Sequence, residues 1–280
     1  MKRIFAVAVL WTCALVAIAA GPAAVRKQVE MSMLVSGTID IRPDGGVRAH
    51  VLDGREALPP GVVKLVDDTL PQWRFEPVLV DGKPVIARTK MSLRVVAKPQ
   101  DDGSFTIGIR GYSFGEPAGV PGETVTSARL PPPAYPEAAY RSGIKGTVYL
   151  LLRIGRDGKV EEAVTEQVNL TVIGDERRMR LGRELLARAA LGKAKSWAFN
   201  PPTKGKAADA PFWSVRVPVD FEFTGEKSAG NGEWEAYVPG PQIKPWWVDG
   251  DALGSPDAMI AGGLYQVGDG PRLLTPPGEG

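Results

Sequence analysis

The chain carries the pattern Trp-x-Phe-x-Pro twice, first in "PQWRFEPV" and about half the chain later in "KSWAFNPP". The residues concerned are Trp73, Phe75, Pro77, Trp197, Phe199 and Pro201. Two large rings spaced by two residues lie on the same side of an extended chain, and Pro stops a preceding helix. We therefore expect both patterns to form buried corners between a helix and a strand. A pair of surfaces that stack on a ligand is the alternative.

The segments around the two corners recur in the same order. Before each corner, two β-rich runs flank an Asp-Gly pair, which favours a hairpin because Gly supplies the positive φ of a tight turn. A helical segment then leads to the corner, and an alternating strand follows it. In the longer, second helix, one face is expected in the core (Leu181, Leu185, Leu186, Ala189, Ala190) and Arg183 and Arg188 are expected in solvent.

This repeated order predicts a duplicated folding unit and an α+β fold class. We expect two small domains, at 34–114 and 127–224, each a short antiparallel sheet packed on a helix. Residues 115–126 would link them. The tail, 225–280, has no hydrophobic period and is rich in Gly, Pro and Trp, which is typical of loop or disorder. Its aromatic rings indicate either packing across the domains or a recognition segment.

The first 20 residues have the composition of an export signal. Lys2 and Arg3 precede an apolar run, Ile4 to Ala20, that ends in small residues. This pattern predicts a cleaved signal peptide at 1–20, and a membrane anchor is the alternative because the run is just long enough to span a bilayer. Cleavage would leave 34 − 2 = 32 basic residues against 32 acidic ones and would remove Cys13, the single cysteine. Such a chain has no disulfide and no electrostatic basis for binding nucleic acid.

Few residues carry the chemistry of an enzyme. His50 is the single histidine, so neither a catalytic triad nor a zinc site is expected. The adjacent carboxylates at 67–68 and 161–162 are expected to point to different sides and to be solvated. The sequence thus predicts a protein that is not an enzyme and has no cofactor, no metal and no small-molecule substrate.

The second half resembles the C-terminal domain of TonB, the periplasmic energy transducer of Gram-negative bacteria. The resemblance covers roughly Ser127 to Phe223 and rests on Tyr-Pro-x-x-Ala, a Gly-x-Val strand, an Asp-Gly turn, the aromatic corner and a final strand. The residues that carry it are Tyr135, Pro136, Ala139, Gly146, Asp157, Gly158, Trp197, Phe199 and Pro201. The first half, which contains Trp73, Phe75 and Pro77, resembles a degenerate copy without Tyr-Pro-x-x-Ala.

The resemblance implies that an extended peptide of an outer-membrane receptor pairs with the edge of the sheet, as in β-augmentation. By position, the docking edge would be Phe212, Trp213, Ser214, Val215, Arg216, Val217, Val219 and Phe221. Pro218 cannot donate to a ladder and therefore marks an edge or strand-end position. The expected partner is a protein of the cell envelope, either a receptor or a motor complex, and exposed sheet edges also allow a homodimer.

Two functions are consistent with this resemblance. The first is a periplasmic protein-interaction module. The second is an inner-membrane-anchored energy transducer that faces the periplasm and drives transport through outer-membrane receptors. The chain has no long Pro-Lys or Pro-Glu spacer, and His50 lies outside the apolar run. These departures favour the interaction module.

Overall fold

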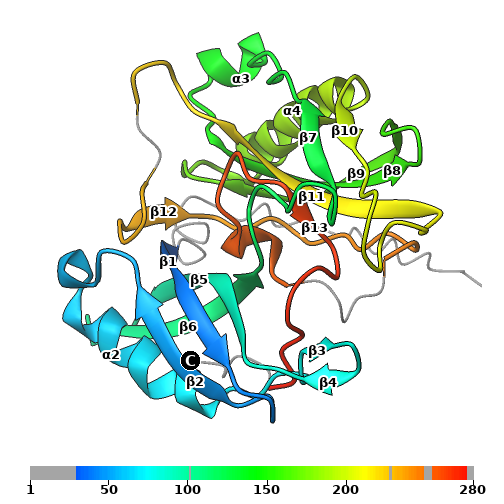
Figure 1. Cartoon of the computed structure of the whole chain (residues 1–280). Helices are drawn as coiled ribbons and strands as arrows, with labels where there is room; N and C mark the ends of the chain where they lie inside the picture. The colour runs from blue at the N-terminus through cyan, green and yellow to red at the C-terminus, as the bar shows by residue number, and fades with distance from the viewer. Residues whose placement is uncertain (1–29, 101, 227–228, 249–253, 276–280) are drawn as a thin grey trace, which may run out of the picture.

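The computed structural model describes residues 30–100, 102–226, 229–248 and 254–275, so the predicted signal peptide or anchor lies outside the described residues. The described chain forms two units, each an antiparallel sheet with a helix on one face (Figure 1). This is the predicted α+β class. The described part of the tail crosses between the two units, where it appears in orange to red in Figure 1.

The first unit is a five-stranded sheet backed by one short helix. Its elements are β1 (Glu30–Ile41), β2 (Val47–Leu52), η1 (Arg55–Ala57), α2 (Pro60–Thr69), η2 (Leu70–Gln72), β3 (Leu79–Val80), β4 (Lys83–Pro84), β5 (Ala87–Pro99) and β6 (Phe105–Phe114). One side of β1 pairs with β5, which pairs in turn with β6. The other side pairs with β2 and, at Glu30–Ser32, with the tail strand β12 (Glu235–Tyr237).

The second unit repeats this plan with a longer helix. Its elements are β7 (Thr126–Arg129), α3 (Glu137–Arg141), β8 (Gly146–Gly155), β9 (Val160–Leu170), α4 (Glu176–Ala194), β10 (Ala198–Asn200) and β11 (Phe212–Phe221). The tail adds η4 (Pro256–Ala258) and β13 (Tyr265–Gln266). The strand order is β13-β11-β8-β9. The order β9-β8-β11 therefore corresponds to β2-β1-β5 in the first unit.

The two aromatic corners are buried, as expected. Trp73 and Phe75 are each 1% exposed and belong to the core of the first unit. Trp197 and Phe199 are each 4% exposed and belong to the core of the second. The Trp197 indole N–H donates to the Pro131 carbonyl at 2.9 Å. These rings are therefore packing residues and not a surface for ligand stacking.

The same main-chain contact joins turn and corner in both units. Phe75 N–H donates to the Gly45 carbonyl at 2.8 Å, and Phe199 N–H donates to the Gly158 carbonyl at 2.9 Å. Both glycines have a positive φ, 82° and 74°. A Cβ on Gly45 would lie 2.0 Å from the Phe75 oxygen, and one on Gly158 would lie 2.2 Å from the Phe199 oxygen. Each corner thus requires the Gly of its Asp-Gly turn. This correspondence supports the predicted duplication, which remains a prediction.

The Tyr-Pro-x-x-Ala motif packs the start of the second unit onto its last strand. The Tyr135 hydroxyl donates to the Ile144 carbonyl, and its ring lies 5.5 Å from Phe221 in an edge-to-face arrangement. Pro136 precedes the first turn of α3 with φ −64°, a position that Pro suits. Ala139 is fully buried in the core. The motif is therefore structural in this chain.

The buried face of helix α4 differs in part from the predicted one. Leu186 and Ala190 are buried as expected, but the prediction was wrong for Leu181, which is 53% exposed. It was also wrong for Arg183, whose guanidinium donates to the Val168 carbonyl at 3.2 Å. The buried positions are Met179, Gly182, Leu186, Ala190 and Ala194. The apolar pattern missed this phase because Gly182 faces the core, where a Cβ would lie 2.8 Å from a methyl group of Ile144.

We predict that Trp197→Ala lowers the free energy of unfolding by about 3–5 kcal/mol, because removal of the large ring creates a cavity that the surrounding core cannot fully fill. Trp246→Ala is the matched control, since that ring is 82% exposed, and should leave stability nearly unchanged. Urea denaturation followed by circular dichroism measures both. Equal midpoints for Trp197→Ala and the parent would contradict the buried role of the ring.

Candidate functional site

Strand β11, which contains the predicted docking residues, lies near the end of the second sheet. One side pairs with β8 over its whole length, from Phe212 to Phe221. On the other side, the described ladder is with the tail strand β13, at Val215 and Arg216. The part of this edge on either side of the two-residue strand has no ladder partner among the described strands. The edge is therefore partly covered by the chain's own tail.

The outward main-chain groups of β11 belong to its even-numbered residues. The Ser214 carbonyl accepts from Val267 N–H at 2.8 Å, and the Pro218 carbonyl accepts from Gly262 N–H at 3.4 Å. Main-chain groups alternate sides along a strand, so residue 218 faces away from β8. Its missing N–H therefore does not interrupt the β8 ladder. This explains how a strand that is paired along its full length accommodates a proline.

The side chains of the predicted docking residues separate onto two faces. Trp213, Val215, Val217, Val219 and Phe221 belong to the core of the second unit. Ser214 and Arg216 alternate with them and lie on the opposite face. Phe212 is half-buried at the start of the strand. A partner at this edge would therefore contact main chain more than these side chains.

A buried ion pair, which the sequence analysis missed, occupies the face opposite the helix. Arg216 donates to both carboxylate oxygens of Glu166, with Nη2–Oε1 at 2.6 Å. The exposed fractions of the two side chains are 1% and 0%. The tail completes the pair, since Arg216 also donates to the Gly254 carbonyl at 3.2 Å and Gln242 Nε2 donates to Glu166 at 3.0 Å. A charge removed from water in this way needs such partners.

A second buried arginine lies on the corresponding face of the first sheet. Arg94 on β5 donates to the Asp257 carbonyl at 2.7 Å and to Ser32 Oγ at 3.0 Å. It also forms an ion pair with Glu235 at 3.1 Å. Tyr237 donates its hydroxyl to the Asp257 carboxylate. Tail residues therefore satisfy the buried cations of both sheets.

The sequence contained a signal for these arginines. Arg94 lies in "SLRVV" and Arg216 in "SVRVP", so each is a single cation in the middle of an apolar run. The alternation of the strand placed both on the face away from the helix. What it did not reveal was that this face is covered, because the covering segment has no periodic pattern.

The described tail residues pack across both units, which was one of the two alternatives. Tyr237 is 3% exposed and Tyr265 is 6% exposed. Trp246, at 82%, is the exception among the described rings. Beyond β13, a bridge forms between Leu273 and Phe75 at the corner of the first unit. The described part of the tail is therefore a structural connection between the two units.

The acidic pairs of the sequence serve as ion-pair partners. Asp67 contacts Arg55 and the His50 ring, with Nε2–Oδ1 at 2.9 Å. Hydrogen bonds from Arg55, and then from His50, lower the pKa of Asp67 to about 2. The prediction that neighbouring carboxylates point apart was wrong for the second pair, because Glu161 and Glu162 both contact Arg153. A register shift at this point of the β8–β9 ladder lets both reach one cation.

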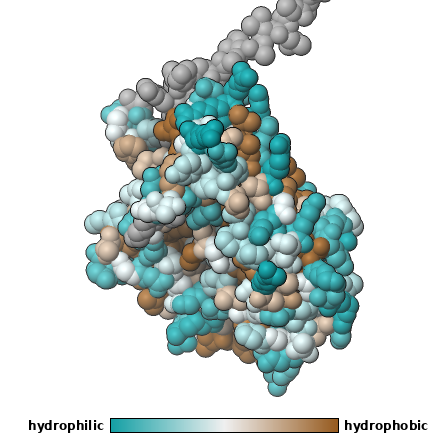
Figure 2. Space-filling model, turned by 90° about the horizontal axis from the view of Figure 1, so that it is seen from above, coloured by the Kyte–Doolittle hydropathy of each residue, from teal (hydrophilic) through white to brown (hydrophobic). Residues whose placement is uncertain are grey.

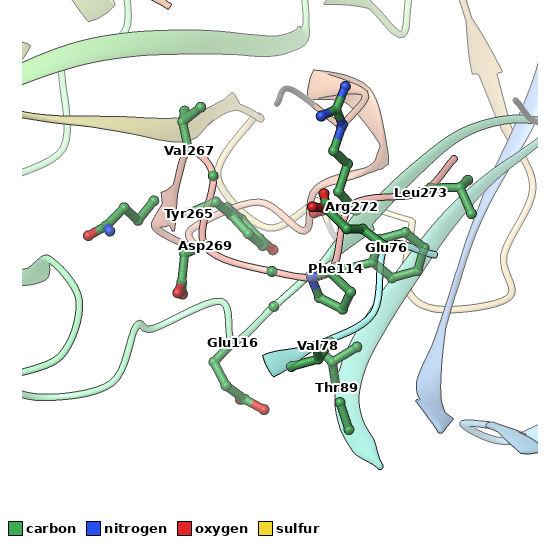
Figure 3. Close-up of a pocket in the computed structure, with 18 of the residues that line it drawn as sticks. Glu76, Val78, Thr89, Phe114, Glu116, Tyr265, Val267, Asp269, Arg272 and Leu273 are labelled. Carbon is green, nitrogen blue, oxygen red and sulfur yellow. The ribbon is translucent and has the colours of Figure 1, made fainter. Parts of the chain in front are cut away.

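A cavity of about 690 Å³ lies between the two units and the tail, and Figure 3 draws 18 of its residues and labels ten of them. Its walls combine acidic, basic and apolar side chains, among them Glu76, Arg88 and Phe114.

Among the described residues, no group of three or more His, Cys, Asp or Glu side chains could hold a metal ion. No helix in the described ranges has the length and apolar character needed to cross a membrane.

The described structure thus combines two helix-backed antiparallel sheets, and strand β11 of the second sheet is only partly paired on the side away from β8. Proteins named TonB are similar to this chain over part of its length. Two from Xanthomonas campestris pv. campestris, strains B100 and ATCC 33913, are each 36% identical over 99 residues, or 35% of this chain and 37% of theirs. A protein named tonB2 from Pseudomonas aeruginosa is 36% identical over 93 residues, or 33% of this chain and 29% of its own.

The matched stretch spans 29–37% of the length of the curated relatives, and no family model and no solved structure matches the chain. Over this stretch the chain is similar to proteins named TonB, which confirms the resemblance drawn from the motifs. The second, N-terminal copy of the domain stays a prediction.

We predict that Glu166→Ala lowers the free energy of unfolding by about 3–5 kcal/mol, because it leaves Arg216 buried without its counter-ion. Glu137→Ala removes an ion pair in which both side chains are 75% exposed and should change little. The double variant Glu166→Leu/Arg216→Met should recover much of the loss. Chemical denaturation of the four proteins measures this. If the double variant lost as much free energy of unfolding as Glu166→Ala, an unpaired buried charge could not be the cause of the loss.

Proposed function

We propose that this TonB-type protein acts in the periplasm as an interaction module, and that it binds a protein of the cell envelope by pairing with the edge of β11. One observation carries the proposal. The last strand of the second unit pairs with β8 along all of one side, whereas its other side has only a two-residue ladder with the tail strand and two further hydrogen bonds from the tail, to the Ser214 and Pro218 carbonyls. Unpaired main-chain groups at a sheet edge are a template for an added strand.

The surface supports a main-chain docking mode. Figure 2 shows one face of the molecule, seen from above, which is mostly hydrophilic with apolar residues in small separate groups, and this view does not resolve the edge of β11. A large exposed apolar patch would instead indicate docking by side-chain burial. Since the side chains at 213, 215 and 217 are committed to the core, the affinity of the edge would come from its carbonyl and N–H groups. Selection would come from neighbouring side chains.

The residues around the cavity and the ion pairs favour no catalytic function. The single histidine contacts Asp67, which is itself bound to Arg55, and Glu161, Glu162, Glu166 and Glu235 are each bound to an arginine. We therefore propose a binding protein that is not an enzyme and that needs no cofactor, nucleic acid or small-molecule substrate. A second copy of this chain at the same edge would give a homodimer.

The names of the relatives favour a second candidate. If residues 1–20 remain attached as an inner-membrane anchor, the chain would be an energy transducer for transport through outer-membrane receptors. The partner would then include a motor complex. In this case the same edge would pair with a receptor peptide, so the two candidates differ in the N-terminus and in the number of partners.

We predict that p-benzoylphenylalanine in place of Phe212 forms a photo-adduct with an envelope protein in cells that produce the full chain. Phe212 is half-buried at the start of β11, where the side of the strand away from β8 has no ladder partner among the described strands. The matched control is the same change at Phe105, which is 61% exposed on the first unit, and should give no such adduct. Mass spectrometry identifies the adduct, and twice the chain mass indicates a homodimer. Equal adducts at both positions, or none at Phe212, would argue against edge docking.

The intact mass of the exported protein separates the two candidates. We expect a mass that lacks residues 1–20, because small residues precede Gly21 as a signal peptidase requires. A mass that retains Met1, together with adducts to an inner-membrane complex, would instead establish the transducer.

A further inference from the structure

We propose that the tail segment Gly262–Val267 is a built-in occupant of the β11 edge, and that a partner's extended segment must displace it. The proposal rests on the function proposed above and specifies its regulation and the chemistry of the partner. The partner segment would run antiparallel to β11. It would present an aliphatic residue, an aromatic residue and a side-chain hydrogen-bond acceptor in succession.

The tail segment makes the contacts of an added strand. Tyr265 and Gln266 pair with Arg216 and Val215. Val267 N–H donates to the Ser214 carbonyl at 2.8 Å, and Gly262 N–H reaches the Pro218 carbonyl at 3.4 Å. These are the outward groups that an incoming strand would need. The edge cannot bind both strands at once.

The side chains of the segment show what the edge accepts. Leu264 is 4% exposed and belongs to the core of the second unit. Tyr265 is 6% exposed, and its hydroxyl accepts from Ile260 N–H at 2.9 Å. Gln266 Oε1 accepts from Val125 N–H at 2.7 Å. The acceptor position is the most specific of the three, because Val125 N–H would otherwise lose its partner.

The segment is held weakly compared with the rest of the sheet. It contributes two residue pairs, against ten between β11 and β8. Gly262, Gly268 and Gly270 surround it, each with a positive φ. Glycines give the segment backbone freedom that it would regain on release. A short strand between such glycines can leave the edge without unfolding the β8–β11 ladder.

Release of the tail segment from β11 would also affect the first unit. After β13 the tail continues to the first aromatic corner, where Glu76 N–H donates to the Arg272 carbonyl at 2.9 Å and Leu274 N–H donates to the Arg74 carbonyl at 2.8 Å. Figure 3 shows Tyr265, Val267, Asp269 and Leu273 along this path. Displacement at β11 therefore loosens the contact between tail and first unit, so that partner binding is coupled to the arrangement of both units.

The test uses a disulfide that holds the segment in place. Because Ser214 and Val267 share a hydrogen bond, Val215 and Gln266 form the non-hydrogen-bonded pair, whose Cα atoms approach to about 4.5 Å. This distance suits a disulfide. Val215→Cys/Gln266→Cys is made in the full chain with Cys13→Ser, because Cys13 is the single native cysteine. The reduced form of the same protein is its control.

A second variant weakens the segment. Leu264→Asp removes its buried anchor, and Ile260→Asp, at a position that is 42% exposed in the same tail, is the matched control. The probe is a fluorescent peptide with the sequence GGLYQVGD of residues 262–269. A peptide of the same composition in scrambled order tests specificity. Fluorescence anisotropy measures binding.

We expect Leu264→Asp to bind the probe about tenfold or more tightly than the parent and Ile260→Asp, because apparent affinity scales with the fraction of free edge. The oxidised disulfide form should bind at least about tenfold more weakly than its reduced form. Equal binding by the oxidised and reduced forms, or no binding by any variant, would overturn the proposal. Photo-adducts at position 212 report on the proposed function separately. Adducts that persist in the oxidised form would leave edge docking intact and exclude displacement.

Discussion

The contact between an Asp-Gly turn and the Phe of an aromatic corner determines how each half of this protein folds. It brings the hairpin tip within hydrogen-bond distance of the chain that leaves the helix, at 2.8 Å in the first unit and 2.9 Å in the second. A side chain on either glycine would meet a carbonyl oxygen. With this contact in place, Trp73 and Trp197 close the helix side of each sheet. The strand that follows each corner, β5 or β11, then returns beside the first strand of its hairpin.

The helix-free faces of the two sheets depend on a different part of the chain. Arg94 and Arg216 lie on those faces and would be costly to bury without polar partners. Tail carbonyls and carboxylates provide these partners, together with Ser32 and Glu166 of the sheets. The tail thus supplies polar partners to the helix-free faces of both sheets and also adds apolar residues, such as Leu264, to the cores. This explains how a segment without hydrophobic periodicity is well packed.

Local sequence determined much of the fold, and distant contacts determined the rest. Turn chemistry and alternation predicted the hairpins, the buried corners and the outward position of Pro218. The phase of α4 was missed at Leu181 because Gly182, which has no side chain to signal burial, approaches Ile144. At Arg216 the alternation gave the correct face, but burial depended on Gly254, a residue far along the chain. The short strands of the tail pair through main chain alone and leave no pattern in the sequence.

The position of β1 has a mechanical consequence. It is an inner strand that pairs with β5 over eleven residues and with β2 and β12 on its other side. Tension transmitted from the residues before Glu30 would load these hydrogen bonds in shear, so that all must break together. The two pairs of β13 offer far less resistance. Under an applied force, the β13 pairs would therefore break before the pairs of β1, and the chain would begin to extend from its C-terminal side.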